Sequence, residues 1–196
     1  MKTKSSWVFY LGRFIFQVLF KLLWGWEIRG QENVPLTGGV IIAPNHRTNA
    51  DPPMIGGAMK RPLHFMAKEE LFKVPVLGFL ISQTNAFPVS RGTGDVGAFK
   101  AALKLLENGE SLLMFPEGTR AKDVDFRPAK QGVGMVACWA QVPVVPVRIF
   151  HPVKLSSFGK LRIKFGKPMM PPKDSKKENY RIFSDAVMEE IKKITW

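Results

Sequence analysis

Residues 39–52 read GVIIAPNHRTNADP, and this stretch decides the fold class. The apolar run from Gly39 to Ala43 is typical of a buried strand, and Pro52 to Met59 are typical of a short helix. A polar cluster lies between the two. A buried strand followed by a loop and a helix is the repeating unit of a parallel α/β sheet.

The rest of the chain repeats this alternation of apolar runs and helical patterns. Residues 95–108 have the clearest helical pattern, with Asp95 as the predicted N-cap and Gly109 where a left-handed residue ends a helix. Its predicted inner face consists of Val96, Phe99, Leu103 and Leu106. The other predicted elements are five strands, Leu63–Ala67, Ala86–Val89, Ser111–Phe115, Val144–Phe150 and Leu161–Phe165, and two helices, near 128–141 and at Lys177–Ile194. We therefore predict one α/β domain, residues 27–196, with a mostly parallel central sheet flanked by helices.

An amphipathic helix, residues 1–26, is predicted to precede this domain. Arg13, Gln17 and Lys21 recur every four residues and form one polar stripe on an otherwise apolar helix. Two cations in its central turns disfavour a spanning helix, because each costs roughly 2.5–3.5 kcal/mol at the bilayer centre. No small-residue cleavage site follows, so the segment does not read as a signal peptide.

We expect this helix to lie in the membrane interface, with Trp7, Trp24 and Trp26 at the level of the lipid headgroups. The alternative is a helix packed on the domain with its polar stripe facing water.

The composition indicates a polyanionic partner. The 196 residues include 29 Lys and Arg against 16 Asp and Glu, which gives a formal charge of +13. Nucleic acid, anionic lipid headgroups and a phosphorylated substrate all fit this charge. A single cysteine, Cys138, excludes an intramolecular disulfide, and the three histidines lack metal-ligand spacing, so no metal site is predicted.

Three polar clusters each follow an apolar run: residues 45–52, 87–92 and 115–120. Loops that leave the carboxyl ends of parallel strands converge on one crevice, where ligands bind. In the first cluster, His46 and Asp51 can meet only if the segment between them turns, because five residues along a helix separate two side chains by about 140°. Asp51 precedes Pro52, so we predict that Asp51 is the helix N-cap and that its carboxylate orients the imidazole as a general base. Alternatively, Asp51 only caps the helix and His46 only bonds to the loop.

The second and third clusters each place an arginine beside a glycine. Guanidinium groups bind phosphate in a bidentate manner, and glycine lets backbone N–H groups approach an anion. Arg91 with Gly92, and Arg120 after Gly118 and Thr119, therefore suit a phosphomonoester. Glu117 is open to three roles: orienting Arg120, bonding a substrate hydroxyl, or holding its loop.

These motifs together resemble the glycerolipid acyltransferases, and most closely the 1-acyl-sn-glycerol-3-phosphate (lysophosphatidate) acyltransferases. The resemblance rests on the H-x-x-x-x-D of residues 46–51, the FPVSRG of residues 87–92, the FPEGTR of residues 115–120 and the VPVVPV of residues 142–147, in family order. It covers roughly residues 27–170. The segment AKEELFKVPVLG, residues 67–78, is also similar to the family.

The resemblance implies the transfer of a fatty acyl group from a thioester to the sn-2 hydroxyl of 1-acylglycerol-3-phosphate, which gives phosphatidic acid. It assigns His46 as the general base and Asp51 as its partner. The implied substrate-binding residues are Lys68, Arg91, Gly92, Glu117, Gly118, Thr119 and Arg120. No cofactor is implied, because the donor, acyl carrier protein (acyl-ACP) or coenzyme A (acyl-CoA), is a co-substrate.

Elimination favours direct attack by the lipid hydroxyl on the thioester. The sequence has no G-x-S-x-G motif, and Cys138 lies in an apolar helical pattern where a thiol is a small core residue.

From the interfacial helix and the positive charge, we expect an enzyme at the cytoplasmic face of the cell membrane, peripheral or monotopic, bound to an anionic surface. The rival readings are an acyltransferase for another acceptor (glycerol-3-phosphate, a headgroup lysophospholipid or an amino-acid lipid) and a non-enzymatic binder of lipid or nucleic acid. The sequence has no nucleic-acid-binding motif to support the latter.

Overall fold

The computed structural model describes residues 6–75, 77–82, 84–89, 96–121, 125–150, 160–174 and 176–196. Within these residues the chain forms one seven-stranded sheet in the order β1-β7-β6-β2-β5-β3-β4. All neighbouring strands are parallel except β6 and β7, which are antiparallel. The strands are β1 (Glu27–Arg29), β2 (Val40–Pro44), β3 (Leu63–Lys68), β4 (Ala86–Val89), β5 (Ser111–Leu113), β6 (Val144–Phe150) and β7 (Arg162–Phe165). The predicted mostly parallel sheet is confirmed.

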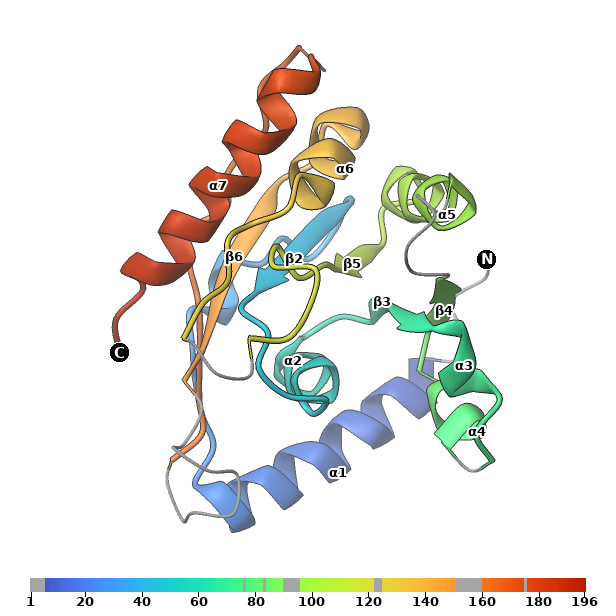
Figure 1. Cartoon of the computed structure of the whole chain (residues 1–196). Coiled ribbons are helices and arrows are strands. Elements are labelled where there is room, and N and C mark those ends of the chain that lie inside the picture. The colour runs from blue at the N-terminus through green and yellow to red at the C-terminus, as the bar shows by residue number, and fades with distance from the viewer. Residues whose placement is uncertain are drawn as a thin grey trace.

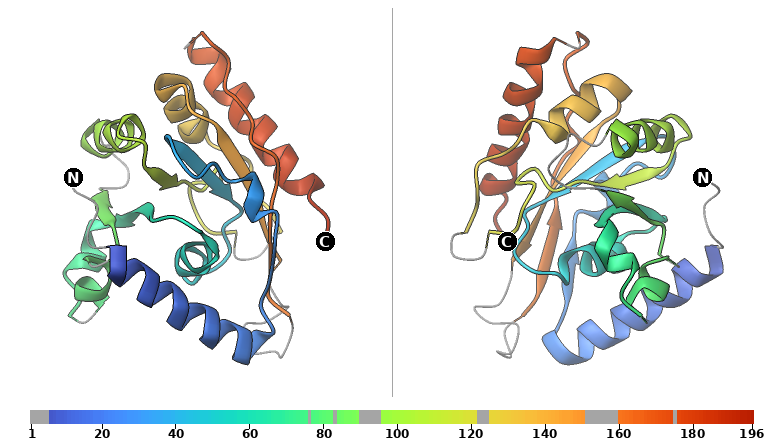
Figure 2. Two further views of the ribbon diagram at one scale, coloured as in Figure 1. Left: turned by 180° about the vertical axis from the view of Figure 1, so that it is seen from behind. Right: turned by 45° about the vertical axis from the view of Figure 1, so that its right-hand side comes forward.

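Helices cover both faces of the sheet (Figures 1 and 2). One face carries α1 (Ser6–Trp24) and α2 (Asp51–Ala58), and the other carries α5 (Val96–Glu107), α6 (Gly132–Ala140) and α7 (Lys177–Lys193). The short helices α3 (Glu69–Phe72) and α4 (Leu77–Ser82) lie beside the β4 edge, and a 3-10 turn, η1, spans Gln31–Asn33.

The central strand β2 contributes to two separate apolar cores. Ile41 packs toward α5, α6 and α7, whereas Ile42 packs toward α1 and α2, and both side chains are fully buried. Because successive side chains of a strand point to opposite faces, a strand covered on both faces must be apolar at every position. This requirement explains the uninterrupted run VIIA.

The prediction for helix α5 is confirmed at the end of the helix and is wrong in part for its inner face. Gly109 follows the helix with a φ of +78°, as predicted. The predicted inner face was wrong at Val96, which is 63% exposed, because the helix instead buries the small residues Ala98 and Ala102 with Leu105 and Leu106. Asp95, the predicted N-cap, lies outside the described residues. The helix predicted near 128–141 begins only at Gly132, because the preceding segment bonds to the loop after β5.

Helix α1 packs on the domain, and its predicted polar stripe divides between the two sides: Arg13 and Gln17 are half-buried, whereas Lys21 is exposed. Its inner side holds Phe16, Gln17 and Phe20 against the domain, where the Phe20 ring also contacts Trp26 at a centroid distance of 5.6 Å. Trp26 is 8% exposed, so its predicted place at the headgroup level is wrong. Apart from the exposed Lys21, the outer side is apolar: Tyr10, Leu11, Phe14, Ile15, Val18, Leu19, Leu22 and Leu23 are each between 41% and 78% exposed.

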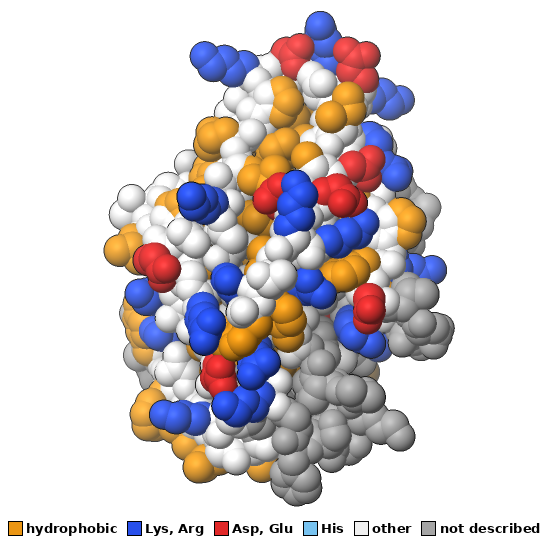
Figure 3. Space-filling view, turned by 90° about the vertical axis from the view of Figure 1, so that its left-hand side faces the viewer, with side chains coloured by type: hydrophobic (Ala, Val, Ile, Leu, Met, Phe, Trp, Pro, Cys, Tyr) orange, Lys and Arg blue, Asp and Glu red, His pale blue; other side chains and the backbone are white. Residues whose placement is uncertain are grey.

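Positive charge is spread over the face that carries α7. On the face that carries α7, Figure 3 shows many Lys and Arg side chains with a few acidic ones among them. Some of this charge holds the C-terminal residues. Arg148 and Lys164 donate hydrogen bonds to carbonyl oxygens at and beyond the end of α7, and the guanidinium groups of Arg29 and Arg162 lie over the Trp196 ring. The surplus of cations is therefore partly structural.

Candidate active site

The candidate site lies where the loops after β2 and β5 meet. The two strands are neighbours, with Ile42 opposite Leu113, so their carboxyl ends lie side by side. Two hydrogen bonds join the loops: the His46 N–H donates to Glu117 Oε1 at 2.8 Å, and the Ala121 N–H donates to the His46 carbonyl oxygen at 2.7 Å. The first and third polar clusters of the sequence therefore form one structure.

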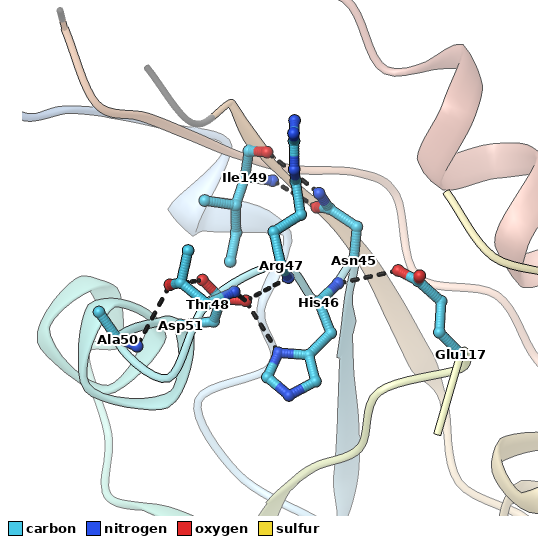
Figure 4. Close-up of polar contacts among 8 residues, drawn as sticks. All are labelled: Asn45, His46, Arg47, Thr48, Ala50, Asp51, Glu117 and Ile149. Atoms are coloured by element: carbon cyan, nitrogen blue, oxygen red, sulfur yellow. Dashed lines mark hydrogen bonds and ion pairs between the residues drawn. The ribbon is translucent and has the colours of Figure 1, made fainter. Parts of the chain in front are cut away.

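His46 and Asp51 are in direct contact (Figure 4). His46 Nδ1 lies 2.8 Å from Asp51 Oδ2. The same carboxylate accepts hydrogen bonds from the N–H groups of Arg47 (2.7 Å) and Thr48 (3.0 Å) and from the Thr48 hydroxyl (2.6 Å). Asp51 is fully buried, and four donors surround its two oxygens. A carboxylate so surrounded is held as an acceptor, which makes His46 Nδ1 the protonated ring nitrogen.

The predicted turn between His46 and Asp51 is present, but the helix boundary differs by one residue. Helix α2 begins at Asp51 rather than at Pro52, and Ala50 is the N-cap residue. The Asp51 side chain folds back over the loop instead of capping the helix ahead of it, because it meets the N–H groups of residues 47 and 48.

The His46 ring is fixed in a second direction by Phe115. The two rings stack with their centroids 3.8 Å apart and their planes 18° apart. His46 is 8% exposed. With Nδ1 bonded to Asp51, the ring has Nε2 left to accept a proton from a substrate.

Asn45 fixes the end of β2 to its neighbour β6. Its side chain is buried and forms two hydrogen bonds with the Ile149 backbone: the Ile149 N–H donates to Oδ1 at 2.8 Å, and Nδ2 donates to the Ile149 carbonyl at 3.2 Å. The carboxamide thus continues the sheet ladder one step beyond the last strand residue and holds the backbone directly before His46.

Glu117 is 1% exposed and bonds to backbone groups on both sides. Oε1 accepts the His46 N–H, and Oε2 accepts the Arg127 N–H at 2.9 Å. Burial raises the pKa of the Glu117 carboxyl above its ordinary value, and these two donors oppose that rise. Of the three roles open to Glu117, these contacts support the one in which it holds the loop.

The other predicted binding residues are placed as follows. Gly118 has a φ of +66°, and a Cβ there would lie 2.9 Å from Lys130 Cδ. Thr119 and Arg120 follow it and are half-buried, and the Arg120 carbonyl accepts a hydrogen bond from the Arg127 guanidinium at 3.2 Å. Lys68 is exposed at the carboxyl end of β3, which pairs with β5. Arg91 and Gly92 lie outside the described residues.

Several contacts at the site were missed by the sequence reading. Asn45, Thr48, Phe115 and Arg127 all support His46, Asp51 or Glu117, yet only Thr48 carries a local signal, since Ser and Thr often bond within turns. The others act through contacts between segments distant in sequence.

The thiol of Cys138 is no candidate nucleophile. Cys138 is fully buried in α6, and burial raises the pKa of its thiol, which disfavours the thiolate. This confirms the prediction of a small core residue. Among the residues that the structure describes, no three His, Cys, Asp or Glu side chains form a group that could hold a metal ion.

Comparisons with known proteins agree with this geometry. A family model described as acyltransferase matches residues 25–150. The chain is 31% identical over 186 residues to the 1-acyl-sn-glycerol-3-phosphate acyltransferase of Bacillus subtilis (strain 168), covering 91% of this chain and 92% of that protein. It is 35% identical over 136 residues to the enzyme of the same name from Streptococcus pneumoniae, covering 66% of this chain and 49% of that protein.

The crystal structure of the 1-acyl-sn-glycerophosphate acyltransferase PlsC from Thermotoga maritima has the same fold. Its TM-score is 0.76 at 28% sequence identity, over 96% of this chain and 81% of that chain. A parallel sheet with a buried His–Asp pair at its carboxyl edge defines an α/β protein with a site suited to general base chemistry. The chain belongs to the acyltransferase family, and these relatives place it with the 1-acyl-sn-glycerol-3-phosphate acyltransferases, as the motifs predicted.

Replacing Glu117 by Ala is expected to destabilise the fold. The buried N–H of His46 would lose its acceptor, at a cost of about 1–3 kcal/mol, and the part-buried N–H of Arg127 would lose its acceptor as well. Thermal and urea unfolding measure the loss. Glu107→Ala, on the exposed side of α5, is the control and should unfold like the wild type. Equal stability of the two variants would show that Glu117 does not hold the loops.

Proposed function

We propose that this protein transfers a fatty acyl group from a thioester donor to the sn-2 hydroxyl of 1-acylglycerol-3-phosphate and so forms phosphatidic acid. The observation that carries the proposal is the 2.8 Å contact between His46 Nδ1 and Asp51 Oδ2, in a chain of this acyltransferase family. The donor is acyl carrier protein or coenzyme A carrying the acyl chain as a thioester.

In this mechanism His46 is the general base. The Nδ1 proton is held by Asp51, so Nε2 takes the proton of the acceptor hydroxyl while its oxygen attacks the thioester carbonyl carbon. Asp51 stabilises the imidazolium that results. The tetrahedral intermediate collapses with cleavage of the C–S bond, the ester forms, and the imidazolium returns its proton to the leaving thiolate. A thioester is already activated, so no acyl-enzyme is needed.

We assign the acceptor phosphate to Arg91 and Arg120, with Gly92, Gly118 and Thr119 shaping the two loops. Guanidinium groups bind phosphate in a bidentate manner, which supports this assignment. In addition, Arg120 lies three residues after Glu117, whose carboxylate accepts a hydrogen bond from the His46 N–H. Lys68, at the exposed end of β3, adds a further cation at this edge of the sheet.

His46→Ala is expected to lower turnover about 10²–10⁴-fold, the range typical of general base catalysis. The assay uses lysophosphatidate with acyl-ACP and with acyl-CoA, and an acceptor panel with glycerol-3-phosphate and lysophosphatidylcholine tests the assignment of the acceptor. The unfolding curve of the variant is the control for folding. A folded variant that keeps wild-type turnover would contradict the role given to His46.

We further propose that the enzyme binds peripherally to an anionic membrane, at the cytoplasmic face, through the outer side of α1. Support comes from the eight exposed apolar side chains on that side and from the net charge of +13. In the described part of the chain, no helix has the length and apolar character to cross a bilayer.

Replacing Phe14 and Leu22 together by Glu is expected to weaken binding to vesicles about tenfold or more, because each buried apolar side chain is worth about 1.5–3 kcal/mol. The two are 63% and 78% exposed on the outer side of α1. Flotation with phosphatidylglycerol-containing vesicles measures the change. Ile182→Glu, on α7 and 63% exposed, is the control and should bind normally. Equal binding by both variants would rule out α1 as the membrane contact.

A further inference from the structure

The C-terminal end of α2 is bound by two glutamine side chains that do not belong to it. Gln17 in α1 donates from Nε2 to the Gly57 carbonyl oxygen at 3.1 Å, and Gln31 in η1 donates to the Ala58 carbonyl oxygen. The last carbonyl groups of a helix have no partner within the helix, so side-chain donors are well placed there. Helix α2 is therefore anchored at this end by α1 and by the turn that follows β1.

Helices α1 and α2 are also in close apolar contact at the same place. A Cβ on Gly57 would lie 2.9 Å from Trp26 Cη2 and 3.4 Å from Phe16 Cβ, so only glycine fits the present spacing. A Cβ on the neighbouring Gly56 would meet nothing within 4 Å. The two glycines therefore differ sharply: one faces α1, and the other faces open space.

The other end of this short helix carries Asp51. Helix α2 has eight residues and is about 12 Å long, so a shift or rotation at its C-terminal end moves its first residue as well. Met54 and Ile55 bury the helix in the core, but apolar burial is non-directional, whereas hydrogen bonds fix a direction and a distance. The two glutamine bonds thus supply directional contacts to α2 at the end opposite Asp51.

We propose that Gln17 and Gln31 are positioning residues that set the geometry of the His46–Asp51 pair through α2. The inference rests on the proposed function, because it concerns the same catalytic pair. It gives α1 two tasks on its two sides: the apolar outer side meets the lipid surface, and Gln17 on the inner side holds the helix that begins with Asp51.

The first experiment removes the hydrogen bond and leaves the packing volume. Gln17→Met is expected to lower kcat on lysophosphatidate in vesicles about three- to tenfold, the equivalent of one net hydrogen bond, with KM and vesicle binding unchanged. Gln17→Lys keeps a donor, and a cation suits a helix C-terminus, so it should restore kcat.

The control for the first experiment is Gln141→Met. Gln141 Nε2 donates to the Cys138 carbonyl at the end of α6 and to the Pro172 carbonyl, so it also bonds to a helix C-terminus, but away from α2. This variant should keep wild-type kcat. Equal kcat values for Gln17→Met and the wild type would overturn the inference, as would a loss that Gln17→Lys fails to restore.

The second experiment crowds the face of α2 that packs on Trp26 and α1. Gly57→Ala inserts a methyl group against the Trp26 ring and Phe16, whereas Gly56→Ala adds the same group in open space, and both changes raise helix propensity alike. We expect Gly57→Ala to lower kcat by at least as much as Gln17→Met, and Gly56→Ala to leave kcat unchanged. Equal kcat values for the two alanine variants, both shown to be folded by thermal unfolding, would contradict the coupling.

The two proposals fail in different ways. If the wild type does not acylate lysophosphatidate with either donor, the proposed function is wrong. If the wild type is active and the Gln17 and Gly57 variants match their controls, the function stands and the positioning role is wrong.

Discussion

The buried carboxylate of Asp51 is the constraint on which the rest of the site depends. A charge removed from water must be compensated by nearby donors, and here four of them surround it: the His46 ring, two backbone N–H groups and the Thr48 hydroxyl. All four donors belong to residues 46–48, in the loop that follows β2. The same hydrogen bonds therefore fold the loop, orient the imidazole and fix its tautomer. The stability of the loop and the orientation of the imidazole therefore depend on the same contacts.

The sheet supplies the rigidity that this arrangement requires. Strand β2 is paired on both sides, with β5 and with β6, and it is buried on both faces. Asn45 extends the pairing toward β6, and Glu117 ties the loop after β5 to the His46 backbone. The loop that carries His46 is thus held by Asn45 and Glu117, two groups that need not touch a substrate. Helix α1 lies on the remaining side, where it contacts α2 and exposes its apolar surface.

Much of the fold could be predicted from the sequence, because strands buried on both faces leave long apolar runs. The strands at 86–89 and 144–150 were predicted at their observed bounds, and the family and the His46–Asp51 turn were predicted as well. The first strand, Glu27–Arg29, was missed because it is short and lies at a sheet edge. One apolar residue between two charged residues gives no apolar run that predicts a strand. Trp26 was misplaced because an aromatic at the end of an amphipathic helix fits a membrane interface as well as a core.

The site was less predictable than the fold, because its supporting contacts join distant segments. No spacing in the sequence indicates that Glu117 accepts the N–H of His46, or that Phe115 stacks on its ring. The polar stripe of α1 could be read from the sequence, but its direction could not. Only the packing of Phe16 and Phe20 shows that Gln17 faces the domain. The roles of Arg91, Gly92 and Lys68 stay predictions, and so does the identity of the thioester donor.

The central claim is that the Asp51 carboxylate makes His46 a base toward a lipid hydroxyl. Its most direct test is the rate of acyl transfer to lysophosphatidate by Asp51→Asn, with folding checked by thermal unfolding. The amide keeps the shape of the side chain but turns one acceptor oxygen into a donor group. We predict a rate at least about 10²-fold below that of the wild type, within the range attributed to an oriented general base. A folded Asn variant that transfers acyl groups at the wild-type rate would contradict the account.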